Sequence, residues 1–202
     1  VTSLVFEEHE GSFLVGVLAG LMSETNKVGF VCGMEVPLIR KFESGFAEGA
    51  KYANPNVEVL VNYAGSFGDP GRGRELAVSQ NERGADIIYH AAGGTGSGVI
   101  DAAVANGFYA IGVDSDQDYM APGTVLTSMV KRVDLAVYDV IKSVVDGTLE
   151  GGVRSFGIQD GGVGTSEFTY TKDIIPQSVL DAIEDAKAKI MSGEIVVSNP
   201  LQ

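Results

Sequence analysis

Hydrophobic positions along this chain follow two alternating periods, one suited to β-strands and one suited to α-helices. Short β-rich runs such as VGFVCG and ADIIYHA indicate strands, and the segments between them repeat apolar residues every three or four positions, as helices with a buried face do. The predicted strands cover residues 1–6, 27–33, 57–63, 85–91, 108–114 and 124–130. The predicted helices cover residues 8–24, 37–53, 70–84, 96–106, 132–147 and 176–193.

Local signals place the ends of several of these helices. Pro37 lies in a predicted first turn, where its missing N–H costs nothing. Asp69 followed by Pro70 has the chemistry of an N-cap and a first helical residue. The last helix is predicted to begin at Pro176 and to end at Gly193.

Repeated strand–helix alternation predicts a mostly parallel sheet covered by helices on both faces. Residues 151–174 are glycine-rich and irregular, and we expect one or two edge strands there. The first helix is expected to turn one stripe toward the core, formed by Phe13, Leu14, Val17, Leu18, Leu21 and Met22. The chain is therefore predicted to be an α/β protein, and 202 residues suffice for one large or two small domains.

Ligands of such sheets bind beyond the carboxyl ends of the strands. Five segments of this chain are expected to converge on that edge, namely residues 33–35, 65–67, 93–95 and 114–116 and Lys131. The glycines among them let backbone N–H groups approach a ligand, and the carboxylates accept hydrogen bonds from hydroxyls or amines. The sequence therefore predicts a small-molecule site at this edge.

Four side chains of this edge carry the binding hypothesis, and each has a structural alternative. Phe67 lies in a polar loop, where its ring can stack on a planar ligand or plug the core. Asp114 and Asp116 can accept hydrogen bonds from a ligand or bond the loop backbone. Lys131 can reach the ligand or be a solvated charge at the start of a helix.

Charge and rare residues narrow the function class. The net charge of −13 and the pI of about 4.4 argue against a nucleic-acid partner, because phosphate binding needs a basic face. Cys32 lies in an apolar run and is expected to be a buried small hydrophobe. His9 and His90 have no cysteine or second histidine at metal-ligand spacing, so we expect neither a metal nor a cofactor. No apolar run has the length of a membrane span.

The glycine turn AAGGTGSGV does not match a phosphate-binding loop. It lacks the Lys and the following Ser or Thr of a Walker A loop, and Val99 or Ile100 stands where a dinucleotide fingerprint needs glycine or alanine. We also find no nucleophile elbow and no evident set of Ser or Cys with His and an acid. These features favour the binding of a neutral, hydroxyl-bearing ligand over catalysis.

Six collinear segments carry a family resemblance: EHEGSFLVG, KVGFVCGMEVPLIRKFESGF, YAGSFGDPGRGRELA, ADIIYHAAGGTGSGV, AIGVDSDQ and TSMVKRVDLAVYD. Over residues 3–164 the chain resembles the basic membrane protein (BMP) family, the substrate-binding lipoproteins of ABC importers, whose best-understood type is the purine-nucleoside receptor. The resemblance implies a type I periplasmic-binding-protein fold, in which two Rossmann-like lobes with parallel sheets close about a hinge on the ligand.

The resemblance also implies roles for individual residues. The base of a purine nucleoside would stack on Phe67, and the glycine turn would offer backbone contacts at Gly94. Asp114 would accept bonds from the ribose hydroxyls, with Asp116 as the reserve carboxylate, and Lys131 would donate to the sugar. The implied activity is capture of a nucleoside for import, without turnover, with an ABC transporter permease as partner.

Relative to the family pattern, the chain is expected to lack the export signal, the lipidated cysteine and the first strands of lobe one. Residues 1–26 and 132–202 would then be pieces of an incomplete first lobe, and residues 28–130 a nearly complete second lobe. The hinge crossings would lie near Lys27 and Lys131. Through its lipid anchor, the full-length protein would be held at the membrane, at the cell surface or in the periplasm.

Other functions remain open from the sequence. Riboflavin or another ring-bearing ligand would also stack on Phe67. A cytoplasmic ligand-sensing domain of a transcription regulator shares the fold, and it would show a helix-turn-helix segment or a basic face. An NAD-linked or sugar-converting enzyme shares the alternation of elements, but it would need a fingerprint or a catalytic pair that this sequence does not show.

Overall fold

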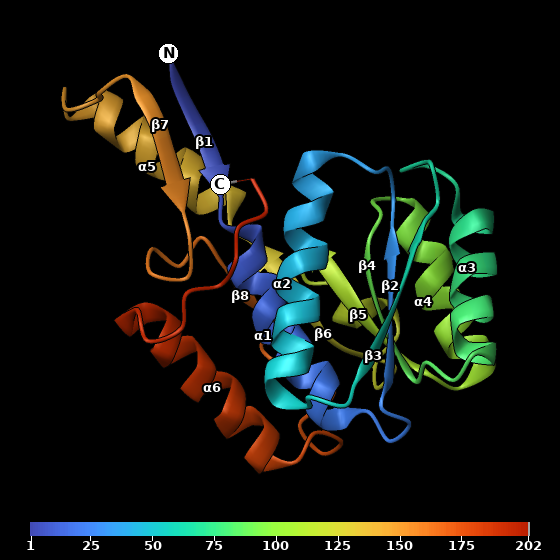
Figure 1. Ribbon diagram of the computed structural model, residues 1–202. Helices are drawn as coiled ribbons and strands as arrows, with labels where there is room; N and C mark the ends of the chain where they lie inside the picture. Colours follow the sequence, from blue (N-terminus) through green and yellow to red (C-terminus); the bar gives the residue numbers. More distant parts are fainter. Residues whose placement is uncertain (202) are drawn as a thin grey trace.

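The computed structural model describes residues 1–201 and contains a large and a small sheet (Figure 1). The large sheet has the strand order β3-β2-β4-β5-β6-β8, and only β8 runs antiparallel to its neighbour. Its strands are β2 (Lys27–Cys32), β3 (Glu58–Tyr63), β4 (Ile87–Ala91), β5 (Tyr109–Asp114), β6 (Val125–Lys131) and β8 (Val163–Thr165). The small sheet is a parallel pair of β1 (Thr2–Phe6) and β7 (Gly152–Phe156). This arrangement confirms the predicted α/β fold class.

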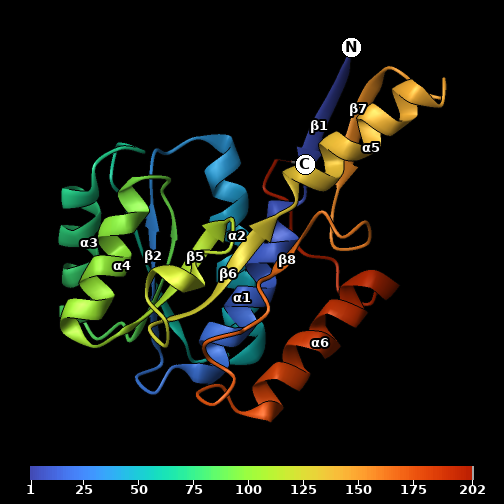
Figure 2. The ribbon, with the colours of Figure 1, turned by 180° about the vertical axis from the view of Figure 1, so that it is seen from behind.

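Helices cover both faces of the large sheet, with α1 and α2 on one side and α3 and α4 on the other (Figure 2). Their bounds are α1 (Glu8–Met22), α2 (Pro37–Ala53), α3 (Pro70–Glu82), α4 (Thr95–Asn106), α5 (Val133–Val145) and α6 (Gln177–Ser192). Between the sheet and α2, the ring of Phe46 lies 5.7 Å from that of Phe30 and 5.2 Å from that of Tyr89, measured between centroids. Aromatic and branched side chains thus fill the core on this face.

The helix ends follow the local signals of the sequence. Pro37 begins α2, where it needs no hydrogen-bond acceptor for its nitrogen. The Arg72 N–H donates to Oδ1 of Asp69 at 3.0 Å, which makes Asp69 the N-cap of α3. Gly193 follows α6 with a φ of +77°, the left-handed conformation of a helix stop.

Helix α1 differs from the single buried stripe that its sequence predicts. Twelve of its fifteen residues are buried, because it lies between α2, α6 and the β6–β8 side of the sheet. Glycines bring α1 and α2 together: a Cβ at Gly16 would lie 2.3 Å from the Phe46 carbonyl oxygen, and one at Gly49 would lie 2.0 Å from that of Phe13. Leu21, predicted to face the core, is instead 41% exposed.

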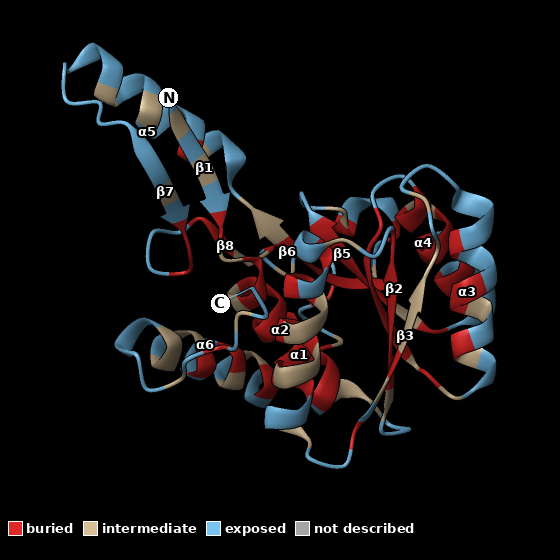
Figure 3. Ribbon diagram, turned by 45° about the horizontal axis from the view of Figure 1, so that its top comes forward, coloured by how far each residue is buried: buried red, intermediate tan, exposed pale blue. Residues whose placement is uncertain are grey.

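Strands β1 and β7 and helix α5 form a projection from the large sheet, called the arm below (Figure 3). Ala136 is the one buried residue of α5, whereas Tyr138 and Ile141 are 66% and 58% exposed. The chain crosses between the arm and the rest of the molecule after β1, after β6 and after β7. Within residues 1–201, no helix combines the length and the apolar character needed to cross a membrane.

The division into lobes at residues 1–26, 28–130 and 132–202 stays a prediction. In the structure, α1 packs along α2, and β8 extends the large sheet beside β6. Segments on both sides of residues 28–130 therefore contact the large sheet or its helices, and the arm stands apart from it.

Candidate functional site

A pocket of about 190 Å³ opens at the carboxyl ends of the central strands, the edge where the sequence predicts a ligand. Strand ends, the loop after β3 and the start of α2 supply its lining, which consists of Leu38, Ile39, Phe42, Phe67, Ala91, Gly93, Val113, Asp114 and Lys131. Three of the predicted binding residues, Phe67, Asp114 and Lys131, therefore meet here. The pocket is called the edge pocket below.

Phe67 forms one wall of the edge pocket and is held through the loop backbone. Oγ1 of Thr95 donates to the Ser66 carbonyl at 3.0 Å, and the Thr95 N–H donates to the Phe67 carbonyl at 3.2 Å. The ring fits beside Gly33 because glycine has no Cβ, which would lie 2.2 Å from the ring. Phe67 is 40% exposed, so its ring is only partly covered by the packing beside Gly33.

Asp114 and Lys131 form an ion pair in the edge pocket, with Nζ of Lys131 3.2 Å from Oδ1 of Asp114. Asp114 ends β5 at a φ of +65°, a left-handed conformation that is unfavourable for a residue with a side chain. The Lys131 ammonium lies 5.7 Å from the ring centroids of both Phe6 and Phe42, within the range of cation–π attraction. The pair presents a hydrogen-bond acceptor beside a donor.

The other two predicted residues do not line the edge pocket. Asp116 is exposed, and its Oδ1 accepts a hydrogen bond from the Asp118 N–H at 2.9 Å, which is the loop-bonding alternative. Gly94 is the N-cap residue of α4, one position after Gly93, which does line the pocket. A ligand role for Asp116 and Gly94 stays a prediction.

The structure adds residues that sequence analysis did not assign to the site. Leu38 lies one turn before Phe42 on α2, and both line the edge pocket. The spacing of these two apolar residues is visible in the sequence, but it is also typical of a helix face that packs on the core. Glu8 and Lys41 lie behind Lys131 with only 3% and 6% exposure. No sequence signal connects Glu8 with Lys41, because their pairing depends on how α1 packs against α2.

Other titratable residues are buried away from the edge pocket. His90 is fully buried, and desolvation lowers its pKa to about 4. Cys32 is fully buried, which confirms that prediction and raises the pKa of its thiol. Burial also lowers the pKa of His9. Among the residues that the structure describes, no three or more His, Cys, Asp and Glu side chains are grouped as a metal site.

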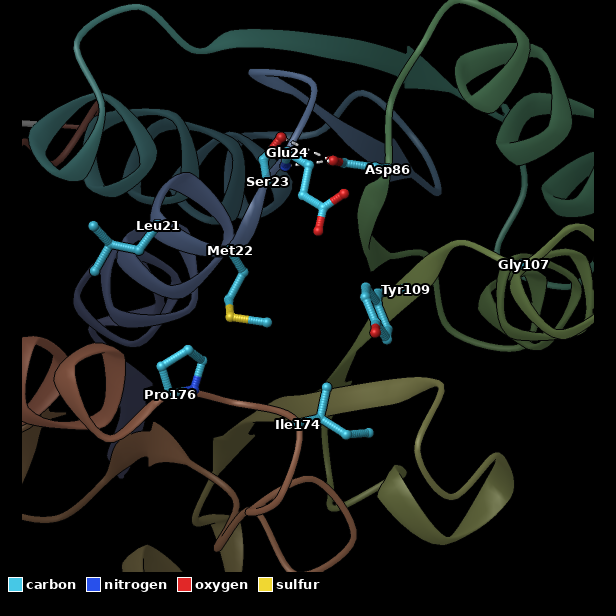
Figure 4. A pocket seen from close by; sticks show the side chains of 9 residues that line it. All are labelled: Leu21, Met22, Ser23, Glu24, Asp86, Gly107, Tyr109, Ile174 and Pro176. Carbon is cyan, nitrogen blue, oxygen red and sulfur yellow. Dashed lines mark hydrogen bonds between the residues drawn. The ribbon is translucent and has the colours of Figure 1, made fainter.

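A larger hollow of about 540 Å³ lies between the end of α1 and the start of β5 (Figure 4). Asp86 lines this hollow. Its carboxylate accepts hydrogen bonds from Oγ of Ser23 at 2.7 Å and from the Glu24 and Thr25 N–H groups at 2.7 and 3.0 Å. Because these bonds hold the turn after α1, the carboxylate is already occupied within the fold. The smaller edge pocket differs in that a ring and an ion pair converge there.

Comparisons with known proteins identify the family. The model of the Bmp family, described as ABC transporter substrate-binding protein PnrA-like, matches residues 1–200. The CD4+ T-cell-stimulating antigen of Listeria monocytogenes is 40% identical and covers 98% of this chain and 59% of its own length. The ABC transporter nucleoside-binding protein BmpA of Lactococcus lactis is 34% identical, and the match covers 98% of this chain and 60% of the length of BmpA.

Two solved structures agree with these relatives. A solute-binding protein of an ABC transporter system from Aeropyrum pernix K1 has a TM-score of 0.90 and 30% identity, covering 100% of this chain and 67% of its own. A transcriptional activator of the comK gene from Bacillus halodurans has a TM-score of 0.88 and 34% identity, and the match covers 98% of this chain and 67% of that protein. The chain spans about three fifths of the length of the curated relatives it matches. It belongs to the Bmp family of PnrA-like ABC transporter substrate-binding proteins.

Proposed function

We propose that the protein is the solute-binding component of an ABC importer and captures a purine nucleoside between two lobes without converting it. The observation that carries the proposal is the meeting of Phe67, Asp114 and Lys131 at the edge pocket. A ring, a carboxylate and an ammonium suit a ligand with a planar base and a hydroxylated sugar. The family and the nucleoside-binding relative from Lactococcus lactis support this choice.

In this proposal the base stacks on Phe67, and the sugar hydroxyls donate to Asp114. Lys131 donates to the sugar oxygens, and Gly94 adds backbone contacts from the glycine turn. Asp116 is the reserve carboxylate. The opposite face of the base is covered by the first lobe.

The charges around the edge pocket suit a neutral ligand. Lys131 is paired with Asp114 at 3.2 Å and lies 3.7 Å from Glu8, which is paired with Lys41 at 2.7 Å. Glu7 also lies 3.7 Å from Lys41, so the two cations have three anions beside them. A phosphate would therefore bring negative charge close to Asp114 without an unpaired cation to receive it. We therefore expect nucleosides to bind more tightly than nucleotides.

The proposed partners are the nucleoside and the permease of an ABC transporter. The proposed location is the cell surface or the periplasm, with a lipid anchor in the full-length protein. Residues 28–130 would form most of one lobe, and the arm would belong to the other. The matched family of ABC transporter substrate-binding proteins supports a place outside the cytoplasm.

A ligand-sensing domain of a regulator is the second candidate, because one solved neighbour is described as a transcriptional activator. The two functions would use the same pocket and differ in the partner, which is a permease in one and DNA in the other. The net charge of −13 opposes direct contact between this chain and DNA. An export signal in the complete gene would favour the importer.

The ligand can be identified by denaturing the natively purified full-length protein and analysing the released small molecules by mass spectrometry. We expect a purine nucleoside. Release of riboflavin would be consistent with the edge pocket as the site and would replace the nucleoside as the proposed ligand. Release of a nucleotide or a free sugar, with no nucleoside, would contradict the proposal.

The pocket itself can be tested with Phe67→Ala and Asp114→Ala in calorimetric titrations with inosine, adenosine and guanosine. Loss of the stacked ring or of a charge-assisted hydrogen bond is expected to weaken binding by about 1–3 kcal/mol each. Tyr119→Ala is the matched control, because Tyr119 is 67% exposed and does not line the edge pocket. Unchanged affinity in both pocket variants would exclude the edge pocket as the site.

A further inference from the structure

Behind the edge pocket, four charged side chains with alternating signs form a row. In order from the pocket they are Asp114, Lys131, Glu8 and Lys41. Nζ of Lys131 lies 3.2 Å from Oδ1 of Asp114 and 3.7 Å from Oε1 of Glu8. Nζ of Lys41 lies 2.7 Å from Oε2 of Glu8. Glu8 therefore directs one carboxylate oxygen toward each lysine.

The inner half of this row is removed from water. Glu8 is 3% exposed and Lys41 is 6% exposed, and buried charges persist only when an opposite charge compensates them. Oε2 of Glu8 accepts no hydrogen bond of regular geometry, so its ion pair with Lys41 provides that compensation. Lys41 also donates to the backbone carbonyl of Phe6 and lies 3.7 Å from Oε2 of Glu7. Lys41 is thus fixed from several sides.

The outer lysine has little other support. Lys131 is the last residue of β6, and its long side chain has several rotatable bonds. The rings of Phe6 and Phe42 flank its ammonium, but ring contacts at 5.7 Å leave the direction of its N–H groups open. Glu8 is the buried acceptor that can set this direction, because Asp114 on the other side is 54% exposed and is itself proposed to bind the ligand.

We propose, building on the nucleoside-binding function above, that Glu8 and Lys41 are positioning residues for Lys131. Lys41 fixes the carboxylate of Glu8, and Glu8 holds the ammonium of Lys131 at the edge pocket in the place where it meets the ligand's hydroxyl groups. Neither Glu8 nor Lys41 lines the edge pocket. Their contribution to affinity comes from ordering the Lys131 side chain before the ligand arrives, which reduces the entropy lost on binding.

The test is calorimetric titration of the full-length protein with inosine and with 2′,3′-dideoxyinosine, which lacks the 2′- and 3′-hydroxyls of the sugar. We expect Glu8→Gln to weaken inosine binding roughly tenfold, as the loss of one ordered charge-assisted contact does. We expect it to leave dideoxyinosine binding nearly unchanged. In a Lys131→Met background, Glu8→Gln should have no further effect on inosine, because the residue through which it acts is gone.

Glu10→Gln is the matched control. Glu10 lies on the same helix, and its Oε2 accepts a hydrogen bond from the Ile158 N–H at 2.8 Å without contacting either lysine. We expect its inosine affinity to equal that of the parent protein. Thermal unfolding checks that each variant folds. If Glu8→Gln does not fold, Lys41→Gln takes its place in the same set of titrations.

The possible failures are distinguishable. Equal weakening of both ligands by Glu8→Gln, or a full additional effect in the Lys131→Met background, would overturn the positioning role and leave the binding function standing. Unchanged inosine binding in Lys131→Met alone would remove Lys131 from the site and would overturn the positioning role. Absence of inosine binding to the parent protein would overturn the proposed function itself.

Discussion

The large sheet and the arm contain similar apolar residues but bury them to very different extents. All five residues of β4 are buried, and so are twelve of the fifteen residues of α1. In α5 only Ala136 is buried, and Val145 is 80% exposed. Because removal of apolar surface from water is the main driving force of folding, the stability of the chain resides in the large sheet and its helices.

This comparison shows what an apolar pattern predicts and what it does not. The pattern of α5 predicts a helix with a face that seeks burial, and the helix forms at the expected place. What would cover that face is not encoded in the same residues. The curated relatives are longer than this chain, and on the lobe proposal the rest of the first lobe would pack there.

The largest expected difference between the two regions comes from truncating one aromatic side chain in each. Phe46→Ala removes a fully buried ring that packs on Phe30 and Tyr89, and it should lower the free energy of unfolding by about 3–5 kcal/mol. Tyr138→Ala in the arm should change it by no more than about 0.5 kcal/mol. Urea unfolding of both variants measures these values, and similar losses would contradict the comparison.

A second difference is the pH dependence that a buried histidine gives to the large sheet. Desolvation lowers the folded-state pKa of His90 from 6.5 to about 4, so the unfolded chain binds this proton first as the pH falls. The resulting contribution to stability is fully present above pH 6.5 and is lost as the pH falls toward 4, by on the order of 3 kcal/mol.

Urea unfolding at pH 7, 5.5 and 4.5 checks this effect. His90→Gln should lose less stability over this range than the parent protein, because glutamine does not titrate. Parallel pH profiles for the two proteins would show that other groups cause the acid sensitivity.

The smallest expected change in the free energy of unfolding is at Asp114 in the edge pocket, where the backbone is locally strained. Asp114 has a φ of +65°, so Asp114→Gly should raise the free energy of unfolding by no more than about 1 kcal/mol while weakening inosine binding. In Asp116→Gly the backbone is not left-handed and the turn-forming carboxylate is lost, so stability should fall. A less stable Asp114→Gly protein would show that this carboxylate supports the fold more than it strains it.

The helices and the strands β1 to β6 were predictable to within two residues at each end because their signals are local. Strands β7 and β8 were expected only as one or two edge strands within residues 151–174. A proline at the start of α2, an N-cap before α3 and a glycine after α6 act on their own turns and need no distant partner. The packing of α1 was not predictable in the same way. Its burial on nearly all sides, and the exposure of Leu21, depend on where α2, α6 and β8 come to lie.

The residues of the candidate site also differ in whether the sequence alone could predict them. Phe67, Asp114 and Lys131 were predicted because strand ends of a parallel sheet meet at one edge, whatever the details of packing. The pair of Glu8 and Lys41 was not, because it requires α1 and α2 to approach closely. A Cβ at Gly45 would lie 2.0 Å from the His9 carbonyl oxygen, which shows how near the two backbones come beside this pair.

The links between the arm and the large sheet limit how the arm can move. The chain leaves β6 at Lys131 and returns at Val163, its partner in the β6–β8 ladder, while the Arg132 N–H donates to the Gly162 carbonyl at 2.8 Å. The segment that follows β1 is also hydrogen-bonded to the end of β7, because the Glu7 N–H donates to the Phe156 carbonyl at 3.0 Å. Torsion between the arm and the large sheet would strain these hydrogen bonds, whereas a swing that bends the three crossing segments together would keep them.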